Sequence, residues 1–139
     1  MAALVKLVPV MQRLAGVQCF GPVKVADASE TDLSTPDTSI VFDVKGIEFV
    51  TVWMKFANYT SVTVKLQETV DGTNYMDITG VTTSTTNTDI SVHRRGPIDA
   101  TDKAGILRGS KIRISIAGTL SASADTMEVW LYAEKAAGQ

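Results

Sequence analysis

Four segments of this chain alternate apolar and polar residues with a period of two, which is the pattern of a half-buried β-strand. They lie at residues 49–56, 62–67, 111–116 and 127–134. Shorter segments of the same kind lie at 39–44, 75–78 and 88–92, and Val, Ile and Thr are frequent in all of them. No helical periodicity follows residue 38. The pattern predicts an all-β fold, an antiparallel β-sandwich or jelly roll.

The faces of these strands predict different surroundings. In 49–56 the second face carries Phe49 and Trp53 among polar residues, so we expect this strand to be covered on both sides. The strands at 62–67 and 111–116 each have one apolar and one polar face. In 127–134 the outer face carries Trp130 and Tyr132 together with two glutamates. An outward aromatic pair of this kind indicates a surface that contacts a partner.

Two dipeptides that end in glycine mark turns between strands. Lys45-Gly46 predicts a tight turn, and Asp71-Gly72 predicts a two-residue hairpin, because this pair accepts the positive φ angles that such turns require. The threonine-rich run at 82–88 is expected to be a hairpin loop or a sheet edge. Residues 100–107 are expected to lie in a long loop.

The first 38 residues predict an extended N-terminal arm with a polar connector at 26–39, ahead of a sandwich domain at 39–139. The apolar residues of the arm need to be buried. Two arrangements satisfy this requirement: an extra strand on the same sandwich, or a strand or helix laid across a neighbouring subunit.

Composition limits the classes of partner. A chain of 139 residues has room for one domain, and its net charge of −2 gives no basis for direct binding to nucleic acid or to anionic membranes. Polar residues interrupt the apolar N-terminal segment well before the length of a membrane span. The single cysteine, Cys19, forms no internal disulfide, which favours folding in a cytoplasm.

Catalytic and metal-binding patterns are weak. Cys19 and His93, the only residues of their types, could form a dyad in principle, but neither has a supporting motif. Together they supply too few ligands for zinc. Asp71 and Asp77 place oxygen ligands near a glycine, as calcium loops do, but the order of ligands in an EF-hand is absent. We therefore expect no enzymatic activity, no cofactor and no metal.

The hairpin at 64–78 resembles one found in small β-sandwich structural proteins of tailed bacteriophages. The shared features are a strand ending at Glu68, the turn Asp71-Gly72, the aromatic Tyr75, and Asp77-Ile78 at the start of the return strand. The resemblance implies a virion protein, folded in the host cytoplasm and then added to the particle. It implies no enzymatic activity. Head decoration or cement proteins, head-fibre bases and tail components all belong to this group.

The sequence thus favours a capsid decoration or cement protein. It would act as a homo-oligomer, a dimer or trimer, and bind the major capsid protein or other virion proteins. The expected contact residues are apolar residues of the arm, two arginines that would form salt bridges between subunits, and the outward aromatic pair: Leu4, Val5, Leu7, Val8, Val10, Met11, Leu14, Phe20, Arg94, Arg95, Trp130 and Tyr132. The alternatives are a carbohydrate- or receptor-binding sandwich with an exposed tryptophan platform, and a phage tail or head-fibre component.

Overall fold

The computed structural model describes residues 9–14, 17–29, 33, 35–83, 87–94, 104–120 and 126–136. Within these residues it has ten strands: β1 (Pro9–Leu14), β2 (Val17–Ser29), β3 (Asp37–Asp43), β4 (Phe49–Ala57), β5 (Tyr59–Thr69), β6 (Met76–Thr83), β7 (Asn87–His93), β8 (Ala104–Ile106), β9 (Lys111–Leu120) and β10 (Thr126–Ala136). No helix long and apolar enough to cross a membrane occurs in this part of the chain.

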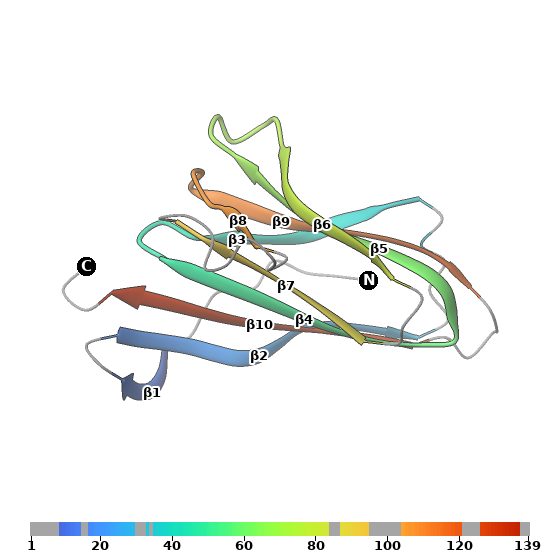
Figure 1. Ribbon diagram of the computed structural model, residues 1–139, viewed down its shortest axis with the longest axis horizontal. Coiled ribbons are helices and arrows are strands. Elements are labelled where there is room, and N and C mark those ends of the chain that lie inside the picture. Colours follow the sequence, from blue (N-terminus) through green and yellow to red (C-terminus); the bar gives the residue numbers. More distant parts are fainter. Residues whose placement is uncertain are drawn as a thin grey trace.

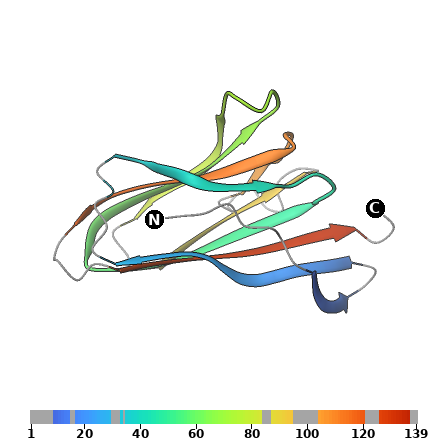
Figure 2. The ribbon, with the colours of Figure 1, turned by 180° about the vertical axis from the view of Figure 1, so that it is seen from behind.

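The strands form two sheets packed face to face, as predicted (Figure 1). One sheet has the order β1-β2-β10-β4-β7-β8 and the other the order β3-β9-β5-β6. Without the edge strands β1 and β8, each sheet has four strands, and most connections cross from one sheet to the other. This is the arrangement of a jelly roll. The view from behind shows the same two layers (Figure 2). All pairs are antiparallel except β7 with β8, which is parallel.

The core lies between the sheets and is built by the alternation seen in the sequence. Val50, Val52 and Met54 of β4 and Ile112 and Ile114 of β9 are all at most 1% exposed. Their outward neighbours are polar or aromatic. Each fully buried side chain of this size contributes roughly 1.5–3 kcal/mol by leaving water, so the two central strands fix the packing of the sandwich.

Residues 17–29 form a strand of the sandwich, which is the first of the two arrangements expected for the N-terminal segment. Only the polar connector expected from residue 26 differs, because 26–29 still belong to this strand. β2 pairs with β10 from Val17 opposite Ala136 to Ser29 opposite Thr126, and Val25 belongs to the core. The pairing shifts register twice, and Gly21, with a positive φ, lies at the second shift. These irregularities break the period of two, so the sequence left two arrangements of this segment open. Residues 1–8 lie outside the described residues.

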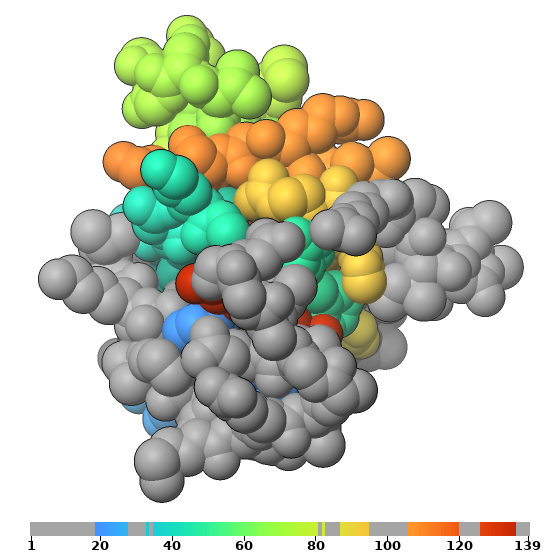
Figure 3. Space-filling model, turned by 90° about the vertical axis from the view of Figure 1, so that its left-hand side faces the viewer, coloured from blue at the N-terminus to red at the C-terminus, as the bar shows by residue number. Residues whose placement is uncertain are grey.

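Two polar side chains, Arg94 and Glu68, connect the sheets at one end of the sandwich. There the loops 44–48 and 107–110 lie beside the end of β7 (Figure 3). Arg94, after β7, donates from Nε to the Ile47 carbonyl at 2.8 Å and from Nη2 to the Val44 carbonyl at 2.9 Å. Glu68 of β5 is 3% exposed, and its Oε2 accepts from the backbone N–H groups of Arg108 at 2.6 Å and Gly109 at 2.7 Å. The loop 107–110 is therefore held by a carboxylate.

The β5–β6 connection is a six-residue loop, 70–75, and the predicted two-residue turn is wrong. Asp71 Oδ1 accepts from the N–H groups of Thr73 at 2.8 Å and Asn74 at 2.7 Å, and Oδ2 accepts from the Asn74 side chain at 2.8 Å. One carboxylate thus organises a wider loop. The loop rises above the body of the sandwich (Figure 1), and Val70 and Met76 beside it are 72% and 62% exposed.

Asp71→Ala is expected to destabilise the protein at neutral pH. The Asn74 backbone N–H, then the Asn74 side chain and the Thr73 N–H, lower the pKa of Asp71 below its ordinary value of 3.8. Because the pKa is lower in the folded state, the ionised carboxylate stabilises the fold above pH 4 or so, and this contribution is lost as the pH falls further. In urea unfolding, the difference between wild type and variant should shrink on acidification. A difference of constant size down to about pH 2 contradicts this assignment.

The remaining connections agree with the sequence only in part. Lys45-Gly46 forms the predicted turn, with Gly46 at φ 81° and the Lys45 N–H donating to Asp43 Oδ1 at 3.0 Å. Residues 82–83 and 87–88, the described part of the threonine-rich run, belong to β6 and β7. β6 is an edge strand, which is the sheet-edge alternative for this run. Residues 104–106 form β8 and not a loop.

Candidate functional site

Two tryptophans lie next to each other on the outer side of the six-stranded sheet. Trp53 of β4 is directly opposite Trp130 of β10, and the same row continues to Lys24 of β2 and Asp89 of β7. The adjacent row contains Asp27, Glu128 and Lys55. We call this surface the Trp53 face and define it by seven residues: Lys24, Asp27, Trp53, Lys55, Asp89, Glu128 and Trp130.

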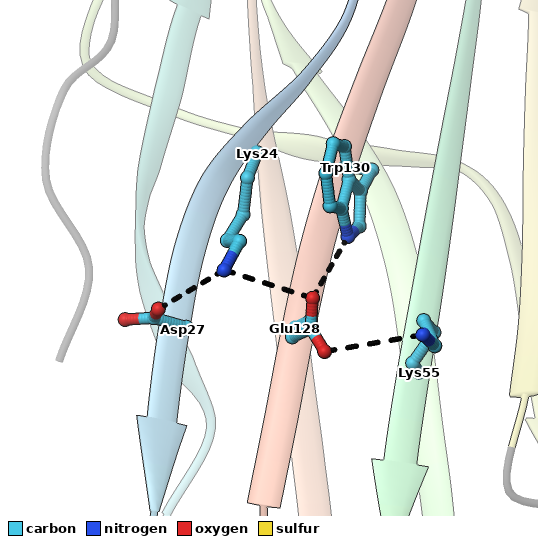
Figure 4. A network of polar contacts seen from close by, with 5 residues as sticks. All are labelled: Lys24, Asp27, Lys55, Glu128 and Trp130. Carbon is cyan, nitrogen blue, oxygen red and sulfur yellow. Dashed lines mark hydrogen bonds and ion pairs between the residues drawn. The ribbon is translucent and has the colours of Figure 1, made fainter.

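A network of charges connects three strands of the Trp53 face (Figure 4). Lys24 Nζ lies 3.4 Å from Asp27 Oδ2 and 3.7 Å from Glu128 Oε1, and Lys55 Nζ lies 4.0 Å from Glu128 Oε2. Pairs this exposed contribute at most about 1 kcal/mol each to stability. Their effect is to place lysines on both sides of one central carboxylate.

The two tryptophans differ in how well they are covered. Trp130 is half-buried, its Nε1 donates to Glu128 Oε1 at 3.2 Å, and Lys24 Nζ lies 5.8 Å from the centroid of its ring. Trp53 is 44% exposed and borders a hollow of about 340 Å³ between β4 and β7. The prediction that β4 is covered on both sides is therefore wrong at Trp53. A large ring left this open is a candidate anchor for a partner.

The same side of the sheet is more tightly packed around Tyr132. The ring of Phe49 lies 4.5 Å from that of His93 and 6.4 Å from that of Tyr132. The Tyr132 hydroxyl donates to Glu134 Oε1 at 2.8 Å and lies 3.1 Å from Cys19 Sγ. The hydrogen bond with Cys19, followed by burial and by Glu134, raises the pKa of Tyr132 above its ordinary value of 10.0. Tyr132 therefore stays protonated and anchors β10 to β2.

The predicted contact residues that the structure describes lie in different environments. Trp130 and Tyr132 both lie on the outer side of β10, as the alternation predicted. Phe20, on β2, packs against the core. Arg94 donates to backbone carbonyls inside the chain, and no carboxylate among the described residues pairs with it, so it acts here as an internal clamp and its salt bridge between subunits stays a prediction. Alternation shows which face a residue occupies, but not that an arginine points inward.

The other predicted contact residues are not described in enough detail to place their side chains. Leu4, Val5, Leu7, Val8 and Arg95 lie outside the described residues. Val10, Met11 and Leu14 belong to β1, which pairs with β2 at the edge of the sheet, but the surroundings of their side chains are not described.

The residues considered for catalysis or metal binding do not lie together in the fold. Cys19 is on β2 and His93 on β7, and two strands lie between them in the sheet, which at strand spacings of roughly 4.8 Å separates them by about 14 Å. The Cys19-His93 dyad is therefore not assembled. Both Asp71 oxygens accept hydrogen bonds from its own loop, and Asp77 pairs with Lys65. Among the described residues no three His, Cys, Asp or Glu side chains cluster as metal ligands.

Trp53, Lys24 and Lys55 were missing from the predicted contact residues. Alternation put Trp53 and Lys55 on one face, but it did not show that β10 and β2 are the neighbouring strands. The row from Lys24 through Trp130 to Trp53 joins positions far apart in the sequence. That signal exists only once the sheet order is known.

Comparison with known proteins shows similarity at the level of the fold alone. No family model and no curated protein matches the sequence. The PBSX exported protein XepA has a TM-score of 0.56 at 16% identity over 84% of this chain, and the match spans only 37% of XepA. A subunit of the disulfide-linked pili of Bacillus endospore appendages has a TM-score of 0.54 at 12% identity, covering 93% of this chain and 99% of the subunit. The SPBc2 prophage-derived protein YomS has a TM-score of 0.51 at 14% identity, covering 91% and 99%.

Proposed function

We propose that this chain is a structural protein of a bacteriophage particle, a capsid decoration or cement protein that binds through its Trp53 face. Its partner is the major capsid protein or another virion protein, and the chain acts as a homo-oligomer. Two of the structures with a similar fold come from prophages, and a third is a pilus subunit. These similarities support a role in assembly, together with the resemblance of the β5–β6 hairpin.

The observation that carries the proposal is the exposed Trp53 ring beside the half-buried Trp130. Trp53 is 44% exposed beside Trp130, on a sheet surface and not in a deep cleft. Tryptophan is enriched among the residues that dominate binding energy at protein interfaces, where charged groups surround the central ring. Lys24, Lys55 and Glu128 occupy such positions around the pair. A specific contact on this face needs to bury on the order of 1,000 Å² or more.

Trp53→Ala is expected to weaken binding to the particle by about 30-fold, because truncating an anchor of this kind typically costs about 2 kcal/mol or more. The variant should fold normally, since the ring lies outside the core. The experiment uses particles produced by the host that encodes the chain, first tested by mass spectrometry for the presence of the chain. Particles lacking the chain are then mixed with purified variants and sedimented.

Met76→Ala is the matched control, because it removes a 62% exposed apolar side chain from a different part of the surface. It should bind like the wild type. If particles contain no copies of the chain, the virion assignment is wrong. If Trp53→Ala and the wild type bind equally well, the particle is contacted through another surface.

A carbohydrate-binding function is the second candidate, because the neighbouring Trp53 and Trp130 could stack on sugar rings. Against it, Trp130 is half-covered by Lys24 and Glu128. Binding on a glycan array that disappears in Trp130→Ala favours this candidate. Absence of glycan binding, together with binding to particles, favours the assembly protein. Cryo-electron microscopy of those particles separates a decoration protein from a tail or head-fibre component.

A further inference from the structure

The outer side of the four-stranded sheet contains a second surface feature, a polar groove of about 470 Å³. It runs along β9 between β3 and β5, on the opposite sheet from the Trp53 face. Its lining is mostly made of side chains that form hydrogen bonds: Pro36, Thr38, Thr63, Lys65, Gln67, Arg113, Ser115 and Ala117. Its volume is within the range of ligand-binding pockets.

The groove exists because the middle strand carries small side chains where its neighbours carry larger ones. Ser115 and Ala117 of β9 form the floor, and their partners on β5 are Lys65 and Thr63. Arg113, two residues before Ser115 on the same strand, closes one end. The hollow is therefore a product of the sequence at 113–117, and a larger residue at Ala117 would fill it.

A chain of contacts fixes the charged side chains of the groove. Lys65 Nζ lies 3.2 Å from Asp77 Oδ2, and Gln67 Nε2 donates to Asp77 Oδ1 at 2.7 Å. Arg113 Nε donates to Gln67 Oε1 at 2.7 Å, and its guanidinium carbon lies 4.0 Å from the centroid of the Tyr75 ring. Side chains ordered in advance lose less entropy when a ligand binds.

The charged side chains that these contacts connect have a net positive charge. Lys65 and Arg113 supply two positive charges and Asp77 one negative charge. Asp77 pairs with Lys65, whereas no carboxylate among the described residues lies within ion-pair distance of Arg113. Arg113 is half-buried, so its charge is less well solvated than on an open surface. A planar guanidinium is the side chain best suited to bind a carboxylate through two parallel hydrogen bonds.

We propose that this groove binds an acidic segment of a partner protein, with an Asp or Glu carboxylate of that segment on Arg113 and Lys65. The hydroxyl groups of Thr38, Thr63 and Ser115 surround the remaining space and serve backbone groups of the segment. A sugar ring fits the groove less well, because Arg113 covers a face of Tyr75, the aromatic ring at this end. The chain then has two binding surfaces of different chemistry on its two sheets.

The test uses the full-length protein and hexaglutamate as a probe, followed by nuclear magnetic resonance. The peptide should bind saturably and shift the amide signals of residues 63–67 and 113–117. Arg113→Gln should weaken binding by about tenfold or more, since a charge-assisted hydrogen-bonded pair is lost, and Arg113→Lys should restore part of the affinity. Ala117→Phe should abolish binding while leaving every charge in place.

Lys45→Gln is the matched control, because it changes the net charge by the same amount at an exposed turn position outside the groove; its affinity should stay within about twofold of wild type. Circular dichroism checks that each variant folds. The proposal is overturned if hexaglutamate does not bind saturably or if Arg113→Gln and Ala117→Phe bind like the wild type. It is also overturned if oligogalacturonate binds in place of the peptide, because the groove is then a saccharide site.

Discussion

Gly21→Ala should destabilise the protein by about 3 kcal/mol or more, because backbone strain and a steric overlap combine at this one position. Gly21 has φ +82°, which strains any residue with a Cβ. In addition, an added Cβ would overlap the backbone carbonyl oxygen of Leu131 and lie 2.9 Å from the Val23 nitrogen. β2 and β10 approach too closely at this point for a side chain. Chemical denaturation followed by circular dichroism measures the loss.

Gly46→Ala and Gly72→Ala are the matched controls. Their φ angles are +81° and +83°, so the backbone strain is the same as at Gly21. Their surroundings are open: a Cβ added at Gly46 would lie 3.8 Å from the Lys135 side chain, and one added at Gly72 would meet no atom within 4 Å beyond its chain neighbours. Each should cost only about 1–2 kcal/mol. If Gly21→Ala costs no more than these two variants, β2 is not packed against β10, and the N-terminal part of the chain is an arm after all.

Glu68→Ala is expected to cost about 2–4 kcal/mol, because two backbone N–H groups lose their acceptor. Glu68 Oε2 accepts from Arg108 and Gly109 at 2.6 and 2.7 Å, and the side chain is almost completely buried. Without the carboxylate, the loop 107–110 either leaves these donors unpaired or moves away from β5. Urea unfolding measures the change in the free energy of unfolding.

Glu68→Gln separates the hydrogen bonds from the space that the side chain fills. The amide keeps an oxygen acceptor at the same position, so most of the stability should remain, although a neutral acceptor is weaker than a charged one. Hydrogen exchange at the Arg108 and Gly109 amides should speed up in Glu68→Ala and much less in Glu68→Gln. Equal effects of the two substitutions would mean that the loop does not depend on this acceptor.

The all-β fold was predictable because the central strands follow the rule of alternation closely. In β4 and β9 every inward position is apolar, so the period of two is plain in the sequence. For β2 the sequence left two arrangements open, a strand of the same sandwich or an arm on a neighbour, since its register shifts and Gly21 break that period. Likewise, the Asp-Gly pair indicated a turn, but the length of the loop depends on which hydrogen bonds Asp71 makes.

The candidate site was only half predictable. The outward position of Trp130 follows from alternation along β10, whereas its neighbour Trp53 depends on the order of strands in the sheet. At Arg94 the basic pair predicted a surface contact, whereas the side chain donates to carbonyl groups of the loops at 44–48 and 107–110. Sequence patterns indicate the face of a strand, but they do not reveal partners from distant strands.

The assembly role of the Trp53 face is tested most directly by hydroxyl-radical footprinting of the chain, free in solution and within the particle. Trp53 is exposed in the isolated chain and should become protected from oxidation in the particle, while Met76, which is still more exposed and lies on the projecting hairpin, serves as the internal reference. We predict at least a several-fold slower oxidation of Trp53 with little change at Met76. If Trp53 is oxidised at the same rate in both states, the partner does not cover this face.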